Sequence, residues 1–150
     1  TRTKSVFKSL KFLSKTKDLP DNILIHDAAR PCLNNKELEK FFEKANSSKI
    51  GLSLGYPLTN SLKKVNSKLQ VIDNIKRDNF YMSFTPQIFN FTKLFLAYTD
   101  IINEEKNVDD EIEAMINSGH KVEIMMSSPK NIKLTYRGDI EVIKALMKKI

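Results

Sequence analysis

A short apolar run that ends abruptly in a charged loop is the feature that most constrains this fold. Residues 23–25 are Ile, Leu and Ile, and the loop that follows holds Asp27 and Arg30. Such a run is typical of a buried strand, and in an open α/β sheet ligands bind just outside the carboxyl ends of strands. A carboxylate there can hold a cation or a ribose hydroxyl, and a guanidinium three residues later can bind phosphate through its planar donors. From these residues alone, a surface turn in which Asp27 and Arg30 merely pair with each other is equally compatible.

The rest of the chain alternates between helical and strand patterns. Helices are predicted over residues 5–13, from an Asn35 cap through Phe42, over residues 88–102 and 109–117, and from Asp139 to Lys149. Strands are predicted over residues 50–54 and 122–126, with a short edge or loop segment over residues 131–135. Gly119 would stop the helix that precedes it. This alternation predicts one α/β domain over residues 1–150, with three layers around a mainly parallel, Rossmann-like sheet.

A polar excursion interrupts this alternation between residues 58 and 77. It holds two alternating runs, residues 61–65 and 69–72, on either side of an Asn-Ser-Lys turn. That is a hairpin pattern, and it is too polar for the centre of a sheet. We therefore expect an arm that projects from the body.

Composition excludes several classes of protein. The 150 residues are 41% hydrophobic and 29% charged, and no run approaches the roughly 18 apolar residues of a membrane span. The single cysteine, Cys32, fits a reducing compartment and a packing role. The net charge of +7 comes mainly from scattered lysines, without an aromatic-plus-basic motif, so a solvated surface is favoured over a nucleic-acid interface. The four glycines form no Gly-rich phosphate loop, which indicates that the first βα unit of such a sheet is missing.

Several motifs in register then point to one family. The motifs are Asp-Ala-Ala-Arg-Pro at 27–31, Ile-Lys-Arg at 75–77, Thr-Pro-Gln at 85–87, Val-Asp-Asp-Glu at 108–111 and Asn-Ile-Lys-Leu-Thr at 131–135. With the Arg-Thr-Lys-Ser-Val start at 2–6, they resemble 2-C-methyl-D-erythritol 4-phosphate cytidylyltransferase of non-mevalonate isoprenoid synthesis. The resemblance covers essentially the whole chain. The N-terminal part of that family, with its Gly-rich CTP loop, is absent from these residues.

The resemblance implies a nucleotidyltransferase that joins the phosphate of 2-C-methyl-D-erythritol 4-phosphate to the α-phosphorus of CTP and releases pyrophosphate. It implies a Mg²⁺ cofactor, a homodimer formed through the arm, and a cytoplasmic location or, in a eukaryote, a plastid-type organelle. These 150 residues alone are expected to be inactive. Carried over by resemblance, the site residues are Arg77 and Lys133 as catalytic cations, Asp27, Arg30, Ser61, Thr85 and Asp109 toward the substrate, Ser5 and Ala28 toward the nucleotide, and Asp27 with Asn131 toward the metal. The arm residues Ser61 and Arg77 would serve the site of the partner subunit.

Other interpretations stay open at this stage. Arg77 and Lys133 are also compatible with ordinary surface charges, and Thr85 with a local cap where a strand turns into a helix. Glu111 is interpreted as a helix-start charge that the dipole favours, and His26 and His120 as structural residues. The same chemistry on ribitol 5-phosphate is the nearest alternative function. A non-catalytic basic module for dimerisation or nucleic-acid binding is the alternative from another class.

Overall fold

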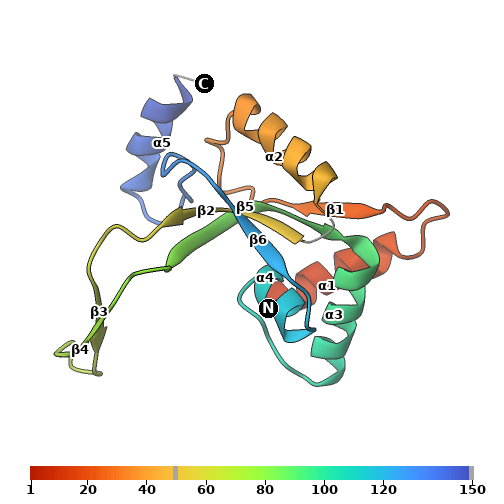
Figure 1. Ribbon diagram of the computed structural model, residues 1–150, viewed down its shortest axis with the longest axis horizontal. Helices are drawn as coiled ribbons and strands as arrows, with labels where there is room; N and C mark the ends of the chain where they lie inside the picture. The colour runs from red at the N-terminus through yellow and green to blue at the C-terminus, as the bar shows by residue number, and fades with distance from the viewer. Residues whose placement is uncertain (49–50, 149–150) are drawn as a thin grey trace.

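The computed structural model describes residues 1–48 and 51–148 and arranges them as a sheet covered by helices on both faces (Figure 1). The helices are α1 (Arg2–Leu13), α2 (Asn35–Ser47), α3 (Phe91–Asn103), α4 (Glu111–Asn117) and α5 (Asp139–Met147). The strands are β1 (Asn22–Ile25), β2 (Gly51–Pro57), β3 (Leu62–Val65), β4 (Val71–Ile75), β5 (Tyr81–Asn90) and β6 (Val122–Met126). In this part of the chain, no helix is both long and apolar enough to cross a membrane.

The central sheet is mixed, which corrects the expectation of a mainly parallel one. Its order is β1-β5-β2-β6, and β5 runs antiparallel to both β1 and β2. Among the strands that the structure describes, β2 and β6 form the one parallel pair. The strands β1, β2 and β6 still point the same way, with the reversed strand inserted between β1 and β2.

The predicted helix over residues 88–102 is wrong at its start, and the strand β5 was not predicted. Residues 88–90 complete β5, and α3 begins at Phe91 after Asn90, whose side chain accepts a hydrogen bond from the Lys93 amide. A proline in a run of residues argues against a central strand, because proline donates no ladder hydrogen bond. Here the register with β2 jumps from Ser53 opposite Gln87 to Leu54 opposite Phe84, so Thr85 and Pro86 lie in a bulge. The strand therefore accommodates Pro86 without losing a ladder bond.

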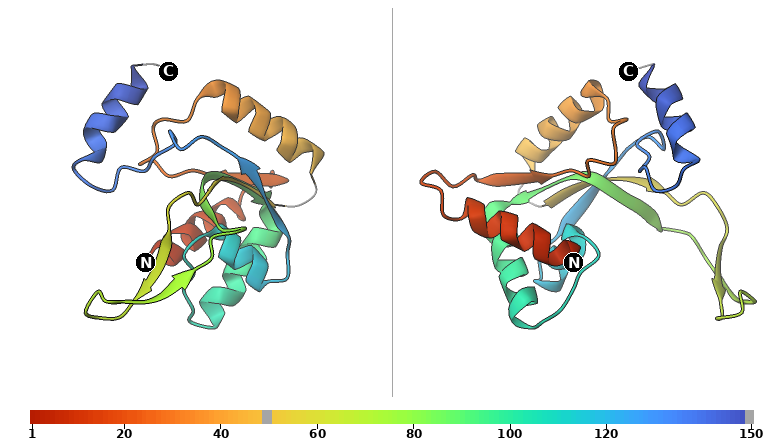
Figure 2. Two further views of the ribbon diagram at one scale, coloured as in Figure 1. Left: turned by 60° about the vertical axis from the view of Figure 1, so that its left-hand side comes forward. Right: turned by 180° about the vertical axis from the view of Figure 1, so that it is seen from behind.

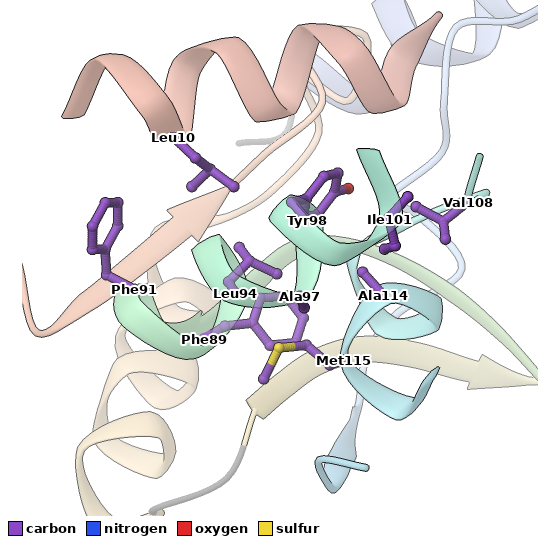
Figure 3. Close-up of a cluster of buried hydrophobic side chains, with 10 residues drawn as sticks. All are labelled: Leu10, Phe89, Phe91, Leu94, Ala97, Tyr98, Ile101, Val108, Ala114 and Met115. Atoms are coloured by element: carbon purple, nitrogen blue, oxygen red, sulfur yellow. The ribbon is translucent and has the colours of Figure 1, made fainter. Parts of the chain in front are cut away.

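Two hydrophobic clusters fill the layers on either side of the sheet. Figure 3 shows the larger one, where α1, α3 and α4 cover one face. Its members include Leu10, Phe89, Leu94 and Tyr98, each at most 1% exposed. Gly51 allows this packing, because a Cβ at that position would lie 2.5 Å from the Phe89 ring. The smaller cluster is formed by Phe41, Leu52, Leu54 and Phe84 on the face that α2 covers. The three-layer prediction is confirmed.

The predicted hairpin is confirmed as the pair β3–β4, which forms a separate two-stranded sheet. Figures 1 and 2 show it extending away from the central sheet. Its second strand begins at Val71, two residues later than expected, because residues 66–70 form the turn: the Asn66 side chain accepts from the Lys68 and Gln70 amides.

Other predicted boundaries differ by one to three residues, except that α2 continues to Ser47, five residues beyond its predicted end. Helix α1 begins at Arg2 instead of residue 5, and Asn34 instead of Asn35 caps α2 through the Glu37 amide. Helix α4 begins at Glu111 because Asp110, not Asp109, is its cap. Gly119 follows the cap of α4 with φ +75°, as expected of a helix stop. The segment over residues 131–135 is a loop, and the predictions at Ile50 and Lys149 lie outside the described residues.

Candidate functional site

The loop after β1 holds Asp27 by its backbone. The Asp27 amide donates to the Thr85 hydroxyl at 2.9 Å, and its carbonyl accepts from the Arg30 amide at 2.9 Å. The bulge in β5 leaves Thr85 out of the ladder with β2, next to the end of β1. Two elements distant in sequence therefore fix the position of the Asp27 carboxylate.

Two cations contact one oxygen of that carboxylate. Arg30 Nε lies 3.3 Å from Asp27 Oδ2, and Lys133 Nζ lies 3.2 Å from the same atom. Burial by itself would raise the pKa of Asp27, but the hydrogen bonds and charges of Lys133 and Arg30 outweigh it, and the pKa lies below its usual value. The carboxylate is therefore ionised at neutral pH. The ion pair between Asp27 and Arg30, which the sequence left open as an alternative, does form, and Lys133 adds a second cation to it.

Arg30 is fixed on several sides. Its Nη1 donates to the Asn131 carbonyl at 2.9 Å, across 101 residues of sequence, and its guanidinium lies 5.3 Å from the centre of the Phe84 ring. Its side chain is 14% exposed, whereas that of Lys133 is 48% exposed. A planar guanidinium fixed in this way is pre-oriented for an anion, and the more exposed Lys133 ammonium supplies a point charge.

The loop over residues 131–134 is attached to the same place. The Leu134 amide donates to the Ala29 carbonyl at 2.8 Å, and Asn131 Nδ2 donates to the Thr85 carbonyl at 3.0 Å. Asn131 is 2% exposed, and its Oδ1 has no hydrogen-bond partner. We call Asp27, Arg30, Thr85, Asn131 and Lys133 the Asp27 cluster.

His26 contacts two residues of the cluster, in agreement with its interpretation as a structural residue. One ring nitrogen, Nδ1, lies 3.0 Å from the Thr85 hydroxyl, and Nε2 lies 3.1 Å from the Arg30 carbonyl. With the Asp27 amide and His26 as neighbours, the Thr85 hydroxyl already has two partners inside the protein. Thr85 thus orients the loop in addition to any contact with a ligand.

The cluster has the oxygen donors that Mg²⁺ prefers. Asp27 offers a carboxylate, and the unpartnered Oδ1 of Asn131 is a buried acceptor that needs a cation or a donor. In proteins Mg²⁺ is commonly held by one or two carboxylates together with substrate phosphates, so a small donor set fits it. Among the described residues, no group of three or more His, Cys, Asp or Glu side chains forms a metal site by itself.

The structure does not bring the arm residues to this cluster. Ser61 and Arg77 are exposed, and Arg77 Nη1 donates to the Thr59 carbonyl within the arm. In Figure 1 the arm leaves the central sheet at the carboxyl end of β2, the edge at which β1 and β6 also end, and projects away from it. Within this one chain, Arg77 is a surface residue with a local partner.

Ser5, Ala28 and Asp109 are exposed residues with mainly local contacts. The Ser5 hydroxyl donates to the Thr1 carbonyl of its own helix, and Ala28 lies in the loop between Asp27 and Arg30. The Asp109 amide donates to Glu113 Oε2 at 2.6 Å, and its carbonyl accepts from Arg2 Nη1 at 3.3 Å.

Sequence reasoning missed the buried group beside Asp109. Glu111 is fully buried, with Arg2 Nη2 at 2.6 Å from Oε2 and the Tyr98 hydroxyl donating to Oε1 at 3.1 Å. Its interpretation as an ordinary helix-start charge is incomplete. It does occupy the first turn of α4, but α1 and α3 cover it. The Arg at position 2, in a chain that otherwise prefers Lys, was the signal that could have revealed this pair.

A cavity of about 850 Å³ lies elsewhere, between the start of α2, the end of β6 and α5, and shares no residue with the Asp27 cluster. Cys32 lines it and is 4% exposed. Burial raises the pKa of the Cys32 thiol, which disfavours the reactive thiolate. The packing role predicted for Cys32 agrees with this, and the cavity shows no clustered chemistry comparable to that around Asp27.

Comparison with known proteins identifies relatives across the whole chain. The family model described as 2-C-methyl-D-erythritol 4-phosphate cytidylyltransferase matches residues 1–149. The enzyme of that name from Wigglesworthia glossinidia brevipalpis is 34% identical over 140 residues, which are 93% of this chain and 59% of the relative. That from Acinetobacter baumannii strain AYE is 31% identical over 146 residues, 97% of this chain and 61% of the relative. The chain thus spans about 60% of the length of these curated relatives.

Solved structures agree. The crystal structure of the Francisella tularensis 2-C-methyl-D-erythritol 4-phosphate cytidylyltransferase superposes with a TM-score of 0.86 at 29% identity, covering 97% of this chain and 68% of that one. A crystal structure of a 4-diphosphocytidyl-2C-methyl-D-erythritol synthase gives a TM-score of 0.85 at 28% identity, covering 98% and 67%. The resemblance predicted from the motifs is confirmed.

Proposed function

This chain belongs to the 2-C-methyl-D-erythritol 4-phosphate cytidylyltransferase family, and from that premise we propose that it forms most of the catalytic domain of such an enzyme. The full-length protein would transfer a cytidylyl group from CTP to 2-C-methyl-D-erythritol 4-phosphate and release pyrophosphate. The observation that carries the proposal is the Asp27 cluster. There one carboxylate and two cations converge at the carboxyl end of β1, from loops far apart in the sequence.

The reaction requires two polyanions to approach each other. An oxygen of the sugar phosphate attacks the α-phosphorus of CTP, the bond from that phosphorus to the bridging oxygen breaks, and pyrophosphate leaves with the electron pair. Catalysis of such a transfer consists mainly of in-line positioning and of neutralising charge that develops on the phosphoryl oxygens. Arg30 and Lys133 are the cations available for this in the cluster.

The roles divide according to how each residue is held. Arg30, fixed by Asn131 and Phe84, would bind phosphate in one orientation. Lys133, half exposed and paired with Asp27, would shift from that carboxylate to the developing phosphoryl charge. Ser5 and Ala28 would contact the nucleotide, and Thr85 and Asp109 the sugar phosphate.

Asp27 and Asn131 would hold Mg²⁺, which supplies further neutralisation of phosphate charge when it is bound. The ionised state of Asp27 at neutral pH and the unpartnered Asn131 Oδ1 support this assignment. In the absence of the metal, Arg30 and Lys133 act as the counter-ions of Asp27.

The arm would complete the site of a second subunit. An isolated two-stranded hairpin is marginal in water, and the arm carries exposed apolar residues that a two-fold partner could cover. Ser61 and Arg77 would then reach the sugar phosphate bound at the partner's Asp27 cluster.

The direct test is an assay of the full-length protein with CTP and Mg²⁺, comparing 2-C-methyl-D-erythritol 4-phosphate with ribitol 5-phosphate. Release of pyrophosphate together with the cytidylylated product is expected with the first and, at most, weakly with the second. Residues 1–150 alone should give no measurable transfer, because a chain of this composition has no Gly-rich loop to bind the triphosphate. Strong transfer by these 150 residues, or a preference for ribitol 5-phosphate, would contradict the proposal.

A further inference from the structure

Glu111 is a fully buried carboxylate whose two partners come from distant parts of the chain. Arg2 on α1 forms an ion pair with Oε2 at 2.6 Å, and Tyr98 on α3 donates to Oε1 at 3.1 Å. A carboxylate is costly to bury unless it is paired and hydrogen-bonded. Glu111 satisfies that condition only while α1, α3 and α4 keep their relative positions.

The other amino group of Arg2 contacts the segment that carries Asp109, a residue proposed to bind the substrate. Its Nη1 donates to the Asp109 carbonyl at 3.3 Å. The neighbouring residues are joined as well: the Thr3 hydroxyl donates to the Val108 carbonyl and accepts from the Val108 amide, both at 3.2 Å. The first turn of α1 and residues 108–111 are thus joined by four contacts, and the buried ion pair is the strongest of these.

The start of α4 also contacts β5 near the Asp27 cluster, because the Ser83 hydroxyl donates to Asp110 Oδ2 at 3.3 Å, two residues before Thr85. Burial by itself would lower the pKa of Arg2, but the hydrogen bond and charge of Glu111, aided by Tyr98 and Asp27, raise it. Figure 3 shows Tyr98 on α3, below α1 in this view, among the side chains of the larger hydrophobic cluster.

We propose that Glu111 is a positioning residue for the transfer reaction. By holding Arg2, it fixes the first turn of α1, which carries Ser5, and the segment that carries Asp109, the residue proposed to contact the sugar phosphate. The inference rests on the proposed function and concerns how the site is held. A purely structural Glu111 would contribute to stability without affecting how the substrates bind.

The test measures kcat and KM for both substrates in the full-length protein, with Glu111→Gln, Arg2→Gln and their combination. Glu111→Gln keeps the shape of the side chain but removes its charge. We expect it to reduce kcat/KM by about 10-fold or more, mainly through a higher KM for the sugar phosphate, because small misplacements of binding groups weaken binding and alignment. The double variant should be no worse than the poorer single variant, since both changes remove the same interaction.

Tyr98→Phe is the matched control for stability. It removes the hydrogen bond to Oε1 in the same buried place but leaves the ion pair with Arg2. Its melting temperature should fall while kcat/KM stays within about threefold of wild type. Glu141→Gln, in an exposed pair with Lys144 at 3.1 Å, should change neither property.

Each outcome decides something different. A folded Glu111→Gln variant with wild-type KM and kcat, or a Tyr98→Phe variant that loses as much activity, would overturn the positioning role and leave the proposed function intact. A wild-type protein that transfers no cytidylyl group would instead overturn the proposed function, and the inference with it. If Glu111→Gln does not fold, Arg2→Lys is the deciding variant. It keeps a cation for Glu111 but loses the second donor, which contacts the Asp109 carbonyl. The KM for the sugar phosphate then rises severalfold if the inference holds and is unchanged if it does not.

Discussion

The Asp27 cluster and the arm β3–β4 both carry proposed site residues, but the fold holds them in opposite ways. In the cluster, the loop after β1, the bulge of β5 and the loop over residues 131–134 hydrogen-bond to one another through backbone and buried groups. In the arm, β3 and β4 pair with each other as a separate sheet, and Val65, Val71 and Ile72 are 43%, 63% and 56% exposed. The chain by itself determines the geometry of the first region, whereas the second needs a surface to pack against.

This difference fits the roles proposed for the two regions, transfer at the Asp27 cluster and association through the arm. Side chains held by their own domain can be pre-oriented for catalysis before any partner arrives. Apolar side chains left exposed on a projecting hairpin favour association, since covering them removes apolar surface from water. The two regions should therefore respond differently when each is altered in the full-length protein.

Removing the arm should have the largest effect. Deletion of residues 58–75, with a short turn in their place, is expected to convert a dimer into monomers and to abolish transfer. Sedimentation would report the association state, and the melting temperature would show whether the Asp27 cluster still folds. A deletion variant that stays dimeric would mean that the arm is not the interface.

Changing single cationic residues should lower activity less than removing the arm, but still by a large factor. Lys133→Ala and Arg77→Lys are each expected to lower kcat/KM by about 10²-fold, roughly 2.7 kcal/mol of transition-state stabilisation. The second change keeps the charge and loses only the planar pair of donors. Lys63→Ala and Lys121→Ala, at exposed positions, serve as controls and should stay within a few-fold. Near-normal kinetics in both test variants, with the fold intact, would remove these residues from the site.

The ionised state of Asp27 gives a pH-dependent test of the cluster. Because Lys133 and Arg30 lower the folded-state pKa of Asp27, its contribution to stability is present above the unfolded-state value of about 4 and is lost as the pH falls through the folded-state pKa. The difference in unfolding free energy between wild type and Asp27→Asn should thus shrink on acidification from pH 6 toward about pH 3. A difference that stays constant over that range would argue against the ion pairs.

The smallest effect on activity is expected from a change at Phe84, whose ring lies against the Arg30 guanidinium. Phe84→Leu removes the ring that the guanidinium covers and a little buried volume, which should lower stability by about 1 kcal/mol. Since Asn131 and Asp27 still hold Arg30, kcat/KM should fall only a few-fold. Denaturant unfolding and steady-state kinetics would test both. A loss as large as that of Lys133→Ala would show that the ring, more than the hydrogen bonds, orients Arg30.

Local sequence signals predicted a good part of this structure. The apolar run at 23–25 with the charged loop after it located β1 and Asp27, and alternation around an Asn-containing turn located the arm. These features depend on neighbours in sequence, so a pattern can report them. The family resemblance added Lys133, which no local pattern distinguishes from other lysines.

The errors came from features that long-range contacts decide. A helix was predicted from residue 88, whereas β5 continues through Asn90, and a register jump against β2 accommodates Pro86. Without β5, the sheet was expected to be mainly parallel. Glu111 reads as a favourable helix-start charge, and only the approach of Arg2 and Tyr98 from other helices makes it buried. No single-sequence pattern encodes such an approach.

Mixed dimers test most directly the claim that each site combines one subunit's Asp27 cluster with the other subunit's arm. Two inactive variants, Arg77→Ala and Lys133→Ala, would be co-expressed in full-length form with different tags, and the doubly tagged dimers would be purified. If the arm serves the partner's site, each purified mixed dimer contains one intact site out of two and should show about half of the wild-type rate per dimer. If both residues serve the same chain's own site, every site in the mixed dimer stays defective, and the absence of any recovery would contradict the account.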